Sequence, residues 1–213
     1  MNRPRVLLAD DHRMVAEGLK SLLTPEFELL EVVEDGRALV EAAKRLRPHA
    51  IVSDITMPNL NGIDALSQLK KDNPSVKVVF LTMHHDVAYA RRALEAGASG
   101  FILKHSAPVE LVMAIRAALD GKTFITPALA GEVMQSLRQG PPEKEDPVAF
   151  LTPRQREILQ LFAEGSSAKE IAAKLGISTR TVEFHKYQMM GSLGINNSAE
   201  LIHFAIKHGL VEV

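Results

Sequence analysis

Five side chains that can do chemistry follow short apolar runs in this sequence. They are Asp10, Asp11, Asp54, Thr82 and Lys104. Carboxylates gathered in one place raise one another's pKa unless a cation lies among them, and Mg²⁺ prefers oxygen ligands of this kind. A lysine ammonium can hold a phosphoryl oxygen, and a carboxylate can be the nucleophile that forms an acyl-phosphate. If these side chains meet in the fold, they predict Mg²⁺-dependent phosphorylation of Asp54.

The elements that must position these side chains alternate between strand-like and helix-like segments. Apolar runs rich in Val, Ile and Leu are typical of buried strands, and they occupy residues 5–9, 28–33, 50–53, 76–81 and 100–104. Helix-period segments separate them, so the pattern predicts an α/β, doubly wound parallel sheet of five strands, for which the flavodoxin-like order 2-1-3-4-5 is a common arrangement. Ligands of such sheets bind at the carboxyl ends of the strands, so the five side chains are expected to converge there.

The remainder of the chain has a different pattern. The stretch "GPPEKEDP" (140–147) is rich in proline and charge, as linkers are, and only short helical segments follow it. We therefore expect a first domain over residues 1–121, a linker with one helix over 122–147, and a small all-α domain over 148–213.

Composition excludes several classes of protein. Lys and Arg number 25 against 26 Asp and Glu, so the whole-chain charge predicts no polyanion partner. The chain has no cysteine, which excludes disulfides, thiolate metal sites and a cysteine nucleophile. The apolar runs are too short for a signal peptide or a membrane span, so we expect a soluble, cytoplasmic protein without a membrane partner.

Each of the reactive side chains also has an ordinary structural explanation. Asp10 or Asp11 can cap a helix that begins near His12. Thr82 can be a turn residue, and Lys104 can be a solvated lysine at a strand end. Accident accounts poorly for the whole set at the strand ends, and we therefore favour the phosphorylation site.

The segments "LLADDH", "SDITMPNLNG", "VVFLTM" and "GFILKHS" resemble the receiver domain of two-component response regulators, over about residues 4–121. The resemblance implies that Asp54 is the phosphoacceptor. It implies that Asp11 ligates Mg²⁺ directly and that Asp10 acts mostly through water, with Asp54 itself and the backbone carbonyl of Thr56 completing the protein ligands. Lys104 would then pair with the phosphoryl group.

The same resemblance implies a switch and a means of tuning it. Thr82 would follow the new phosphoryl group, and Phe101 would be the aromatic rotamer switch, although it can equally be a core residue. Phe101 has no hydroxyl, so any switching must act through packing. The side chains of Thr56 and His84 are expected to overhang the site and to tune the lifetime of the acyl-phosphate.

The last third of the chain has the pattern of a helix-turn-helix. In "SAKEIAAKLGISTRTVEFHKYQMMGSLG" a helix, a turn at Gly176 and a second helix follow one another. Val182, His185, Met189 and Leu193 should pack inward. The residues that we expect to contact DNA are Lys169, Arg180, Thr181, Glu183, Phe184, Lys186 and Tyr187. Residues 148–213 carry seven Lys and Arg against six Asp and Glu, a net of +1, so a helical bundle for protein contacts is the alternative.

The stretch "LTPRQREILQLFAEGSSAKEIAAKLGISTRTVEFH" resembles the LuxR/FixJ (NarL)-type helix-turn-helix output domain. This chain departs from that family with Ala168 where Asn is frequent, Glu183 where Lys or Arg is frequent, and Gly191-Ser192 in place of a more basic pair. These changes weaken phosphate attraction, so dimerisation is expected to be needed for useful affinity. The resemblance implies a dimer contact in the last helix, which can equally close the core; its residues are Leu201, Ile202, Ala205 and Ile206.

Together the two resemblances imply a response regulator and not an enzyme. A sensor histidine kinase would donate phosphate to Asp54, and the binding of double-stranded promoter DNA, with homodimer formation, would change in consequence. An aspartyl-phosphate hydrolase would need a second carboxylate two residues after Asp54, where this chain has Thr56. A phosphorylation-independent DNA-binding regulator with a pseudo-receiver, and a regulator acting through protein contacts, are the alternatives.

Overall fold

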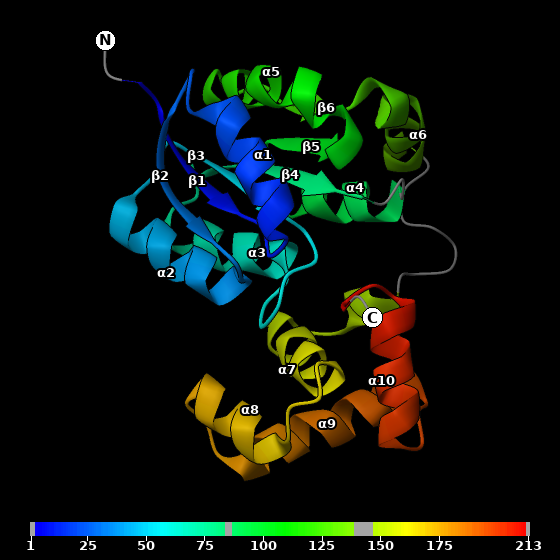
Figure 1. The fold of residues 1–213 in the computed structure, drawn as a ribbon. Helices are drawn as coiled ribbons and strands as arrows, with labels where there is room; N and C mark the ends of the chain where they lie inside the picture. Colours follow the sequence, from blue (N-terminus) through cyan, green and yellow to red (C-terminus); the bar gives the residue numbers. More distant parts are fainter. Residues whose placement is uncertain (1–2, 84–86, 139–146, 212–213) are drawn as a thin grey trace.

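The computed structural model describes residues 3–83, 87–138 and 147–211 of the 213-residue chain. The described residues form two bodies, a sheet flanked by helices and a smaller group of helices (Figure 1). None of the helices in these ranges is long and apolar enough to cross a membrane.

The first body is built on a parallel sheet with the strand order β2-β1-β3-β4-β5-β6. Its strands are β1 (Arg5–Ala9), β2 (Glu28–Val33), β3 (Ala50–Asp54), β4 (Lys77–Thr82), β5 (Gly100–Leu103) and β6 (Phe124–Ile125). The predicted doubly wound α/β fold is confirmed. The sheet has one strand more than the five expected, because the two residues of β6 pair with Gly100 and Phe101 of β5.

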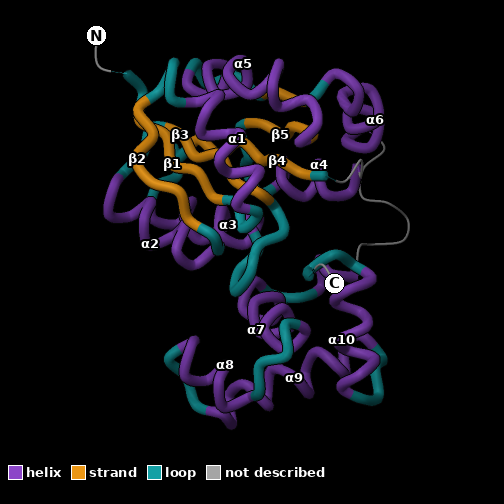
Figure 2. The backbone as a smooth tube through the Cα atoms, in the orientation of Figure 1, coloured by secondary structure: helices purple, strands orange, loops and turns teal. Residues whose placement is uncertain are grey.

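Helices cover both faces of this sheet (Figure 2). They are α1 (Arg13–Leu23), α2 (Gly36–Leu46), α3 (Gly62–Asp72), α4 (Val87–Glu95), α5 (Ala107–Leu119) and α6 (Pro127–Arg138), with a 3₁₀ turn at Lys104–Ser106. Successive strand residues point to opposite faces, so Ile51 of β3 joins the core with α2, α3 and α4, while Val52 joins the core with α1 and α5.

The segment expected as a linker contributes to the first body. Leu129 and Val133 of α6 are fully buried in the same core as Ala90 of α4. Together with β6, this helix extends the sheet domain beyond the expected boundary at residue 121. The proline-rich residues 140–146 of the expected linker lie outside the described residues.

The second body contains four α-helices in the described range 147–211. After a 3₁₀ turn (Pro147–Phe150) come α7 (Pro153–Ala163), α8 (Ala168–Leu175), α9 (Thr179–Leu193) and α10 (Ser198–Lys207). Thr152 and Ser167 begin α7 and α8 with capping boxes. Gly176 ends α8 with a φ of 64°, a left-handed conformation that glycine adopts without a steric penalty. The expected helix, glycine turn and second helix are therefore present as α8 and α9.

Candidate phosphorylation site and output helices

The carboxyl ends of four neighbouring strands bring the predicted side chains to one edge of the sheet. In the parallel register Asp54 pairs with Leu81, and Thr82 pairs with Leu103. Lys104 follows directly after β5, as Asp10 does after β1. Because all strands run in the same direction, these ends lie side by side, which is where a doubly wound sheet binds its ligands.

Lys104 lies between two buried carboxylates. Its Nζ atom is 2.5 Å from Oδ2 of Asp54 and 2.9 Å from Oδ2 of Asp10. Burial by itself would lower the pKa of Lys104, but the charges and hydrogen bonds of Asp54 and Asp10 raise it above its usual value. With only 6 % of its side chain exposed, Lys104 is a buried cation and not a solvated lysine.

The backbone around Asp54 orients its carboxylate. The amide of Ile55 donates to Oδ1 at 2.6 Å, while Oδ2 accepts from Lys104. A Cβ at Gly62 would overlap the carbonyl oxygen of Asp54, so glycine is needed for this close approach. Burial raises the pKa of Asp54 to about 6; Lys104 opposes this shift, and Asp10 adds to it.

The residue types beside Asp54 fit a hard divalent cation. Asp10, Asp11, His12 and Asp54 each offer one ligand atom, and these atoms all lie within 4.8 Å of one another. Oδ2 of Asp10 has Nζ of Lys104 at 2.9 Å and Oδ1 of Asp11 has Nδ1 of His12 at 2.9 Å, and neither buried oxygen has a further hydrogen-bond partner among the described residues. Buried carboxylate oxygens need a compensating partner, and an oxygen-ligated cation supplies one.

Neither aspartate of the pair caps the first helix. The residue before α1 is His12, and its side chain makes no capping hydrogen bond. Asp10 instead accepts from the amide of His12 at 2.9 Å, and Nδ1 of His12 lies 2.9 Å from Oδ1 of Asp11. Sequence reasoning did not select His12, although its position directly after the acidic pair was a usable signal.

The remaining predicted receiver residues are placed as follows. Thr82 is buried at the end of β4, and Phe101 is fully buried in the core on the α2, α3 and α4 side of the sheet. Thr56 is half-buried in the loop after β3. His84 lies outside the described residues.

The second body closes over part of this site. A pocket of about 120 Å³ is lined from the sheet domain by Asp11, Thr56, Met57 and Pro58, and from the second body by Gln160, Glu164 and Val211. Sequence reasoning placed none of the latter three at the site. They lie about a hundred residues away in the chain, and α7 had been assigned only an apolar face.

The outer face of α9 is exposed to solvent. Phe184 and Tyr187 expose 58 % and 64 % of their surface, and Arg180 and, on α8, Lys169 are exposed as well. The charge of Lys186 already has partners within the domain, because its Nζ lies 3.8 Å from Oε2 of Glu183 and 5.5 Å from the ring centre of Phe162. Thr181 is half-buried near the start of the helix, where its amide donates to Ser178.

The four residues expected at a dimer contact divide into two pairs. Leu201 and Ala205 are buried in the core of the second body, because they lie on the side of α10 that packs against α7. Ile202 is half-buried, and Ile206 exposes 38 % of its surface. The core-closing alternative therefore holds for the first pair, and only the second pair reaches the surface.

Comparison with known proteins agrees with both bodies. Residues 6–116 match the model of the response regulator receiver domain, and residues 149–205 match that of the bacterial regulatory proteins of the luxR family. The transcriptional regulatory protein MctR of Rhizobium johnstonii is 38% identical, with 97% of this chain and 95% of MctR covered. The response regulator UvrY of Escherichia coli K12 is 34% identical, with 96% and 94% covered.

A similar solved structure is that of RcsB from Salmonella enterica serovar Typhimurium bound to promoter P1flhDC in the presence of the phosphomimetic BeF3-. It shares 29% sequence identity and a TM-score of 0.63, and the match covers 95% of this chain and 98% of that one. The receiver match, the luxR-type match and these full-length relatives agree with the acidic site and the helix-turn-helix. The chain belongs to the two-component response regulators that join a receiver domain to a LuxR-type DNA-binding output domain, and its family is one of transcriptional regulators and not of enzymes.

Proposed function

We propose that Asp54 is the residue that accepts the phosphoryl group from a sensor histidine kinase, and that Mg²⁺ is the cation of the site. The observation that carries this proposal is the buried contact of Lys104 with both Asp54 and Asp10, within a cluster in which Asp10, Asp11, His12 and Asp54 each bring one ligand atom within 4.8 Å of the others. A cation and a lysine on either side of a carboxylate suit the transfer of a charged phosphoryl group.

The proposed reaction is a transfer of the phosphoryl group from the donor's histidine to Asp54. A carboxylate oxygen of Asp54 forms a bond to phosphorus as the bond to the histidine nitrogen of the donor breaks, and the electron pair leaves with that nitrogen. Lys104, already charged, pairs with a phosphoryl oxygen. Asp10, Asp11, Asp54 and the Thr56 carbonyl would hold Mg²⁺, which when bound offsets the negative charge of the phosphoryl oxygens.

The switch that follows is assigned to the residues beside the new phosphoryl group. Thr82 ends the strand next to Asp54 and is placed to donate to a phosphoryl oxygen. Phe101 is fully buried, so its contribution must be a change of packing inside the core. Thr56 and His84 are proposed to tune how long the acyl-phosphate lasts.

DNA recognition is assigned to the exposed face of α9. Arg180 and Lys169 are proposed to contact phosphates, and Phe184 and Tyr187 to lie against the groove with Thr181, Glu183 and Lys186 beside them. Ile202 and Ile206 are proposed as the accessible part of a homodimer contact. Because promoter DNA is the proposed ligand, we propose that the protein acts in the cytoplasm.

The functional parts of the chain are proposed to be a receiver over 1–121, a connecting segment over 122–147 and a DNA-binding domain over 148–213. In that division, β6 and α6 are a structural extension of the receiver and take no part in phosphoryl transfer.

Intact mass after treatment with Mg²⁺ and acetyl phosphate tests the proposal. One added phosphoryl group, labile to hydroxylamine and absent from Asp54→Asn, is expected. An adduct that persists without Asp54 would overturn the assignment. Absence of both the adduct and beryllofluoride binding would favour a regulator that does not use phosphate.

A further inference from the structure

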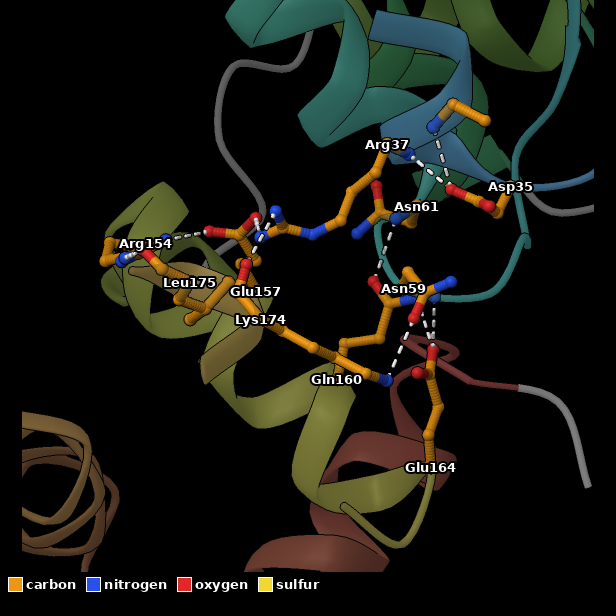
Figure 3. Close-up of polar contacts among 11 residues, drawn as sticks. Asp35, Arg37, Asn59, Asn61, Arg154, Glu157, Gln160, Glu164, Lys174 and Leu175 are labelled. Atoms are coloured by element: carbon orange, nitrogen blue, oxygen red, sulfur yellow. Dashed lines mark hydrogen bonds and ion pairs between the residues drawn. The ribbon is translucent and has the colours of Figure 1, made fainter. Parts of the chain in front are cut away.

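The loop that follows Asp54 and helix α7 lie at the centre of the contact between the two domains, with α2 and the end of α8 beside them (Figure 3). We call this set of contacts the domain interface. Gln160 of α7 donates from Nε2 to the carbonyl of Met57 at 2.7 Å, and its Oε1 accepts from the amide of Asn61 at 2.8 Å. The side chain is 1 % exposed. It therefore bridges two backbone groups on opposite sides of one tight loop.

Further polar pairs surround Gln160. Arg156 of α7 reaches Asp64 of α3 with Nη2 at 2.5 Å and Nε at 2.9 Å, and Asp64 is buried. Glu164 accepts from the amide of Asn59 at 3.0 Å. On the other side of the interface, Arg37 of α2 donates to the buried Glu157.

A second contact lies beyond the loop. Tyr89 of α4 donates from its hydroxyl to the carbonyl of Gly209 at 2.9 Å. The loop follows the strand that ends in Asp54, and α4 follows the strand that ends in Thr82. The output domain thus contacts the receiver on both sides of the phosphorylation site.

The position of Gln160 ties this contact to the phosphorylation site. Its Met57 partner is the residue after Thr56, whose carbonyl is proposed to ligate the cation. The two carbonyls belong to adjacent peptide units of one loop, so the hydrogen bond from Gln160 restrains the backbone next to the proposed ligand. The shared pocket beside Asp11 and Thr56 is only about 120 Å³ and includes the carboxylate of Glu164, which disfavours an added anionic group.

Between residues that the structure describes, no hydrogen bond or ion pair joins the recognition helix α9 to the receiver. The exposed face of α9 carries Phe184 and Tyr187, both more than half exposed, while the interface is made by α7, the end of α8 and the turn after α10. Covering of the DNA-reading face therefore cannot be what the contact does.

From these observations we infer that Gln160 is a positioning residue for the phosphorylation site, because it holds the loop after Asp54 against α7. Phosphorylation of Asp54 then weakens the contact between this loop and α7, and loss of that contact favours phosphorylation. The inference rests on the proposed role of Asp54. Binding of a phosphoryl mimic and docking of the domain are then coupled equilibria, and each must weaken the other by the same factor.

The test is beryllofluoride affinity, in the presence of Mg²⁺, of the full chain and of Gln160→Met. Methionine keeps the length of the side chain and removes the two hydrogen bonds across the interface, to Met57 and from Asn61, as well as the one to Glu164 within α7 and its end. We expect the affinity to rise about tenfold, the value of roughly one buried hydrogen bond. The matched control is Gln135→Met on the exposed surface of α6, which should leave the affinity unchanged. A folding defect would lower the affinity, so the expected direction separates positioning from stability.

The second measurement is the distance between the domains. The chain has no cysteine, so Lys20→Cys on α1 and Lys207→Cys on α10 give one specific pair of spin labels. Beryllofluoride should widen the distance distribution of the otherwise unchanged chain, and Gln160→Met should widen it without beryllofluoride. Unchanged affinity and unchanged distances in Gln160→Met would overturn the inference while leaving phosphorylation intact. Failure of the unmodified chain to bind beryllofluoride or to accept a phosphoryl group would instead overturn the proposed function.

Discussion

Replacement of Asp54 by asparagine should stabilise the receiver at neutral pH. The carboxylate is buried, and its pKa in the folded chain is about 6 against an ordinary value of 3.8. Folding therefore favours the protonated carboxyl. The free energy of folding that is lost by keeping Asp54 ionised grows as the pH rises from 3.8 to about 6. At about 1.4 kcal/mol for each pH unit, that cost is about 3 kcal/mol at pH 7.5.

Asparagine removes the charge and keeps one of the two oxygens, so it can accept from Ile55 or from Lys104 in the present geometry but not from both. Lys104 retains its ion pair with Asp10 at 2.9 Å, so no new unpaired cation is created. Urea unfolding without Mg²⁺, followed by circular dichroism, should give a higher free energy of unfolding for Asp54→Asn at pH 7.5, by up to about 3 kcal/mol less the value of the one hydrogen bond that is lost. At pH 5, where the folded carboxyl is mostly protonated, the difference should fall to about half.

Two results would refute this reasoning. A lower free energy of unfolding for Asp54→Asn at pH 7.5 would mean that the pair with Lys104 outweighs desolvation. A gain that does not change between pH 5 and 7.5 would mean that the carboxyl does not titrate in this range. The control is Asp72→Asn, because Asp72 is an exposed residue in a surface ion pair with Lys44 and should show little change at either pH.

Three further outcomes are expected. Leu201→Ala should lower the free energy of unfolding of the output domain in urea by about 3 kcal/mol, because the side chain of Leu201 is buried. Ile206→Ala should lower it by less than about 1 kcal/mol, because Ile206 is exposed. Equal losses would contradict the assigned faces of α10. Lys169→Ala should reduce the salt dependence of promoter binding, measured by fluorescence anisotropy, by about one unit of the log–log slope, and an unchanged slope would remove Lys169 from the interface. Gly209→Ala should widen the distribution of distances between the two spin labels, because the added Cβ would overlap Tyr89. Gly194→Ala should not, because Gly194 has a similar φ of 66° but no atom near the added Cβ.

The meeting of the candidate site residues at one edge of the sheet was predictable because it follows from chain order alone. Parallel strands place all their carboxyl ends at one edge, so a residue directly after a strand can be assigned to that edge without any knowledge of packing. Asp10, Asp54 and Lys104 are of this kind. The ambiguity between a helix cap and a ligand at Asp10 could be resolved only by geometry, since both uses need a carboxylate at the start of a helix.

The domain interface was not predictable for the opposite reason. Gln160 is 103 residues from its partner Met57, and Arg156 is 92 residues from Asp64. Polar residues on a helix surface have no periodic signal that distinguishes a contact with another domain from contact with water. The sequence of α10 shows a similar limit, because its apolar face has the same pattern whether it closes a core, as Leu201 does, or contacts a second chain.

The exposed face of α9 has a consequence for the kinetics of the response. A regulator whose reading helix stays uncovered before the signal arrives can already associate weakly with chromosomal DNA and slide along it. Its search for a promoter then proceeds before Asp54 is phosphorylated. If phosphorylation acts through pairing with a second copy, as proposed, the signal changes the residence time at the promoter, and we expect the delay between stimulus and transcription to be set by dissociation and pairing and not by diffusion to the DNA.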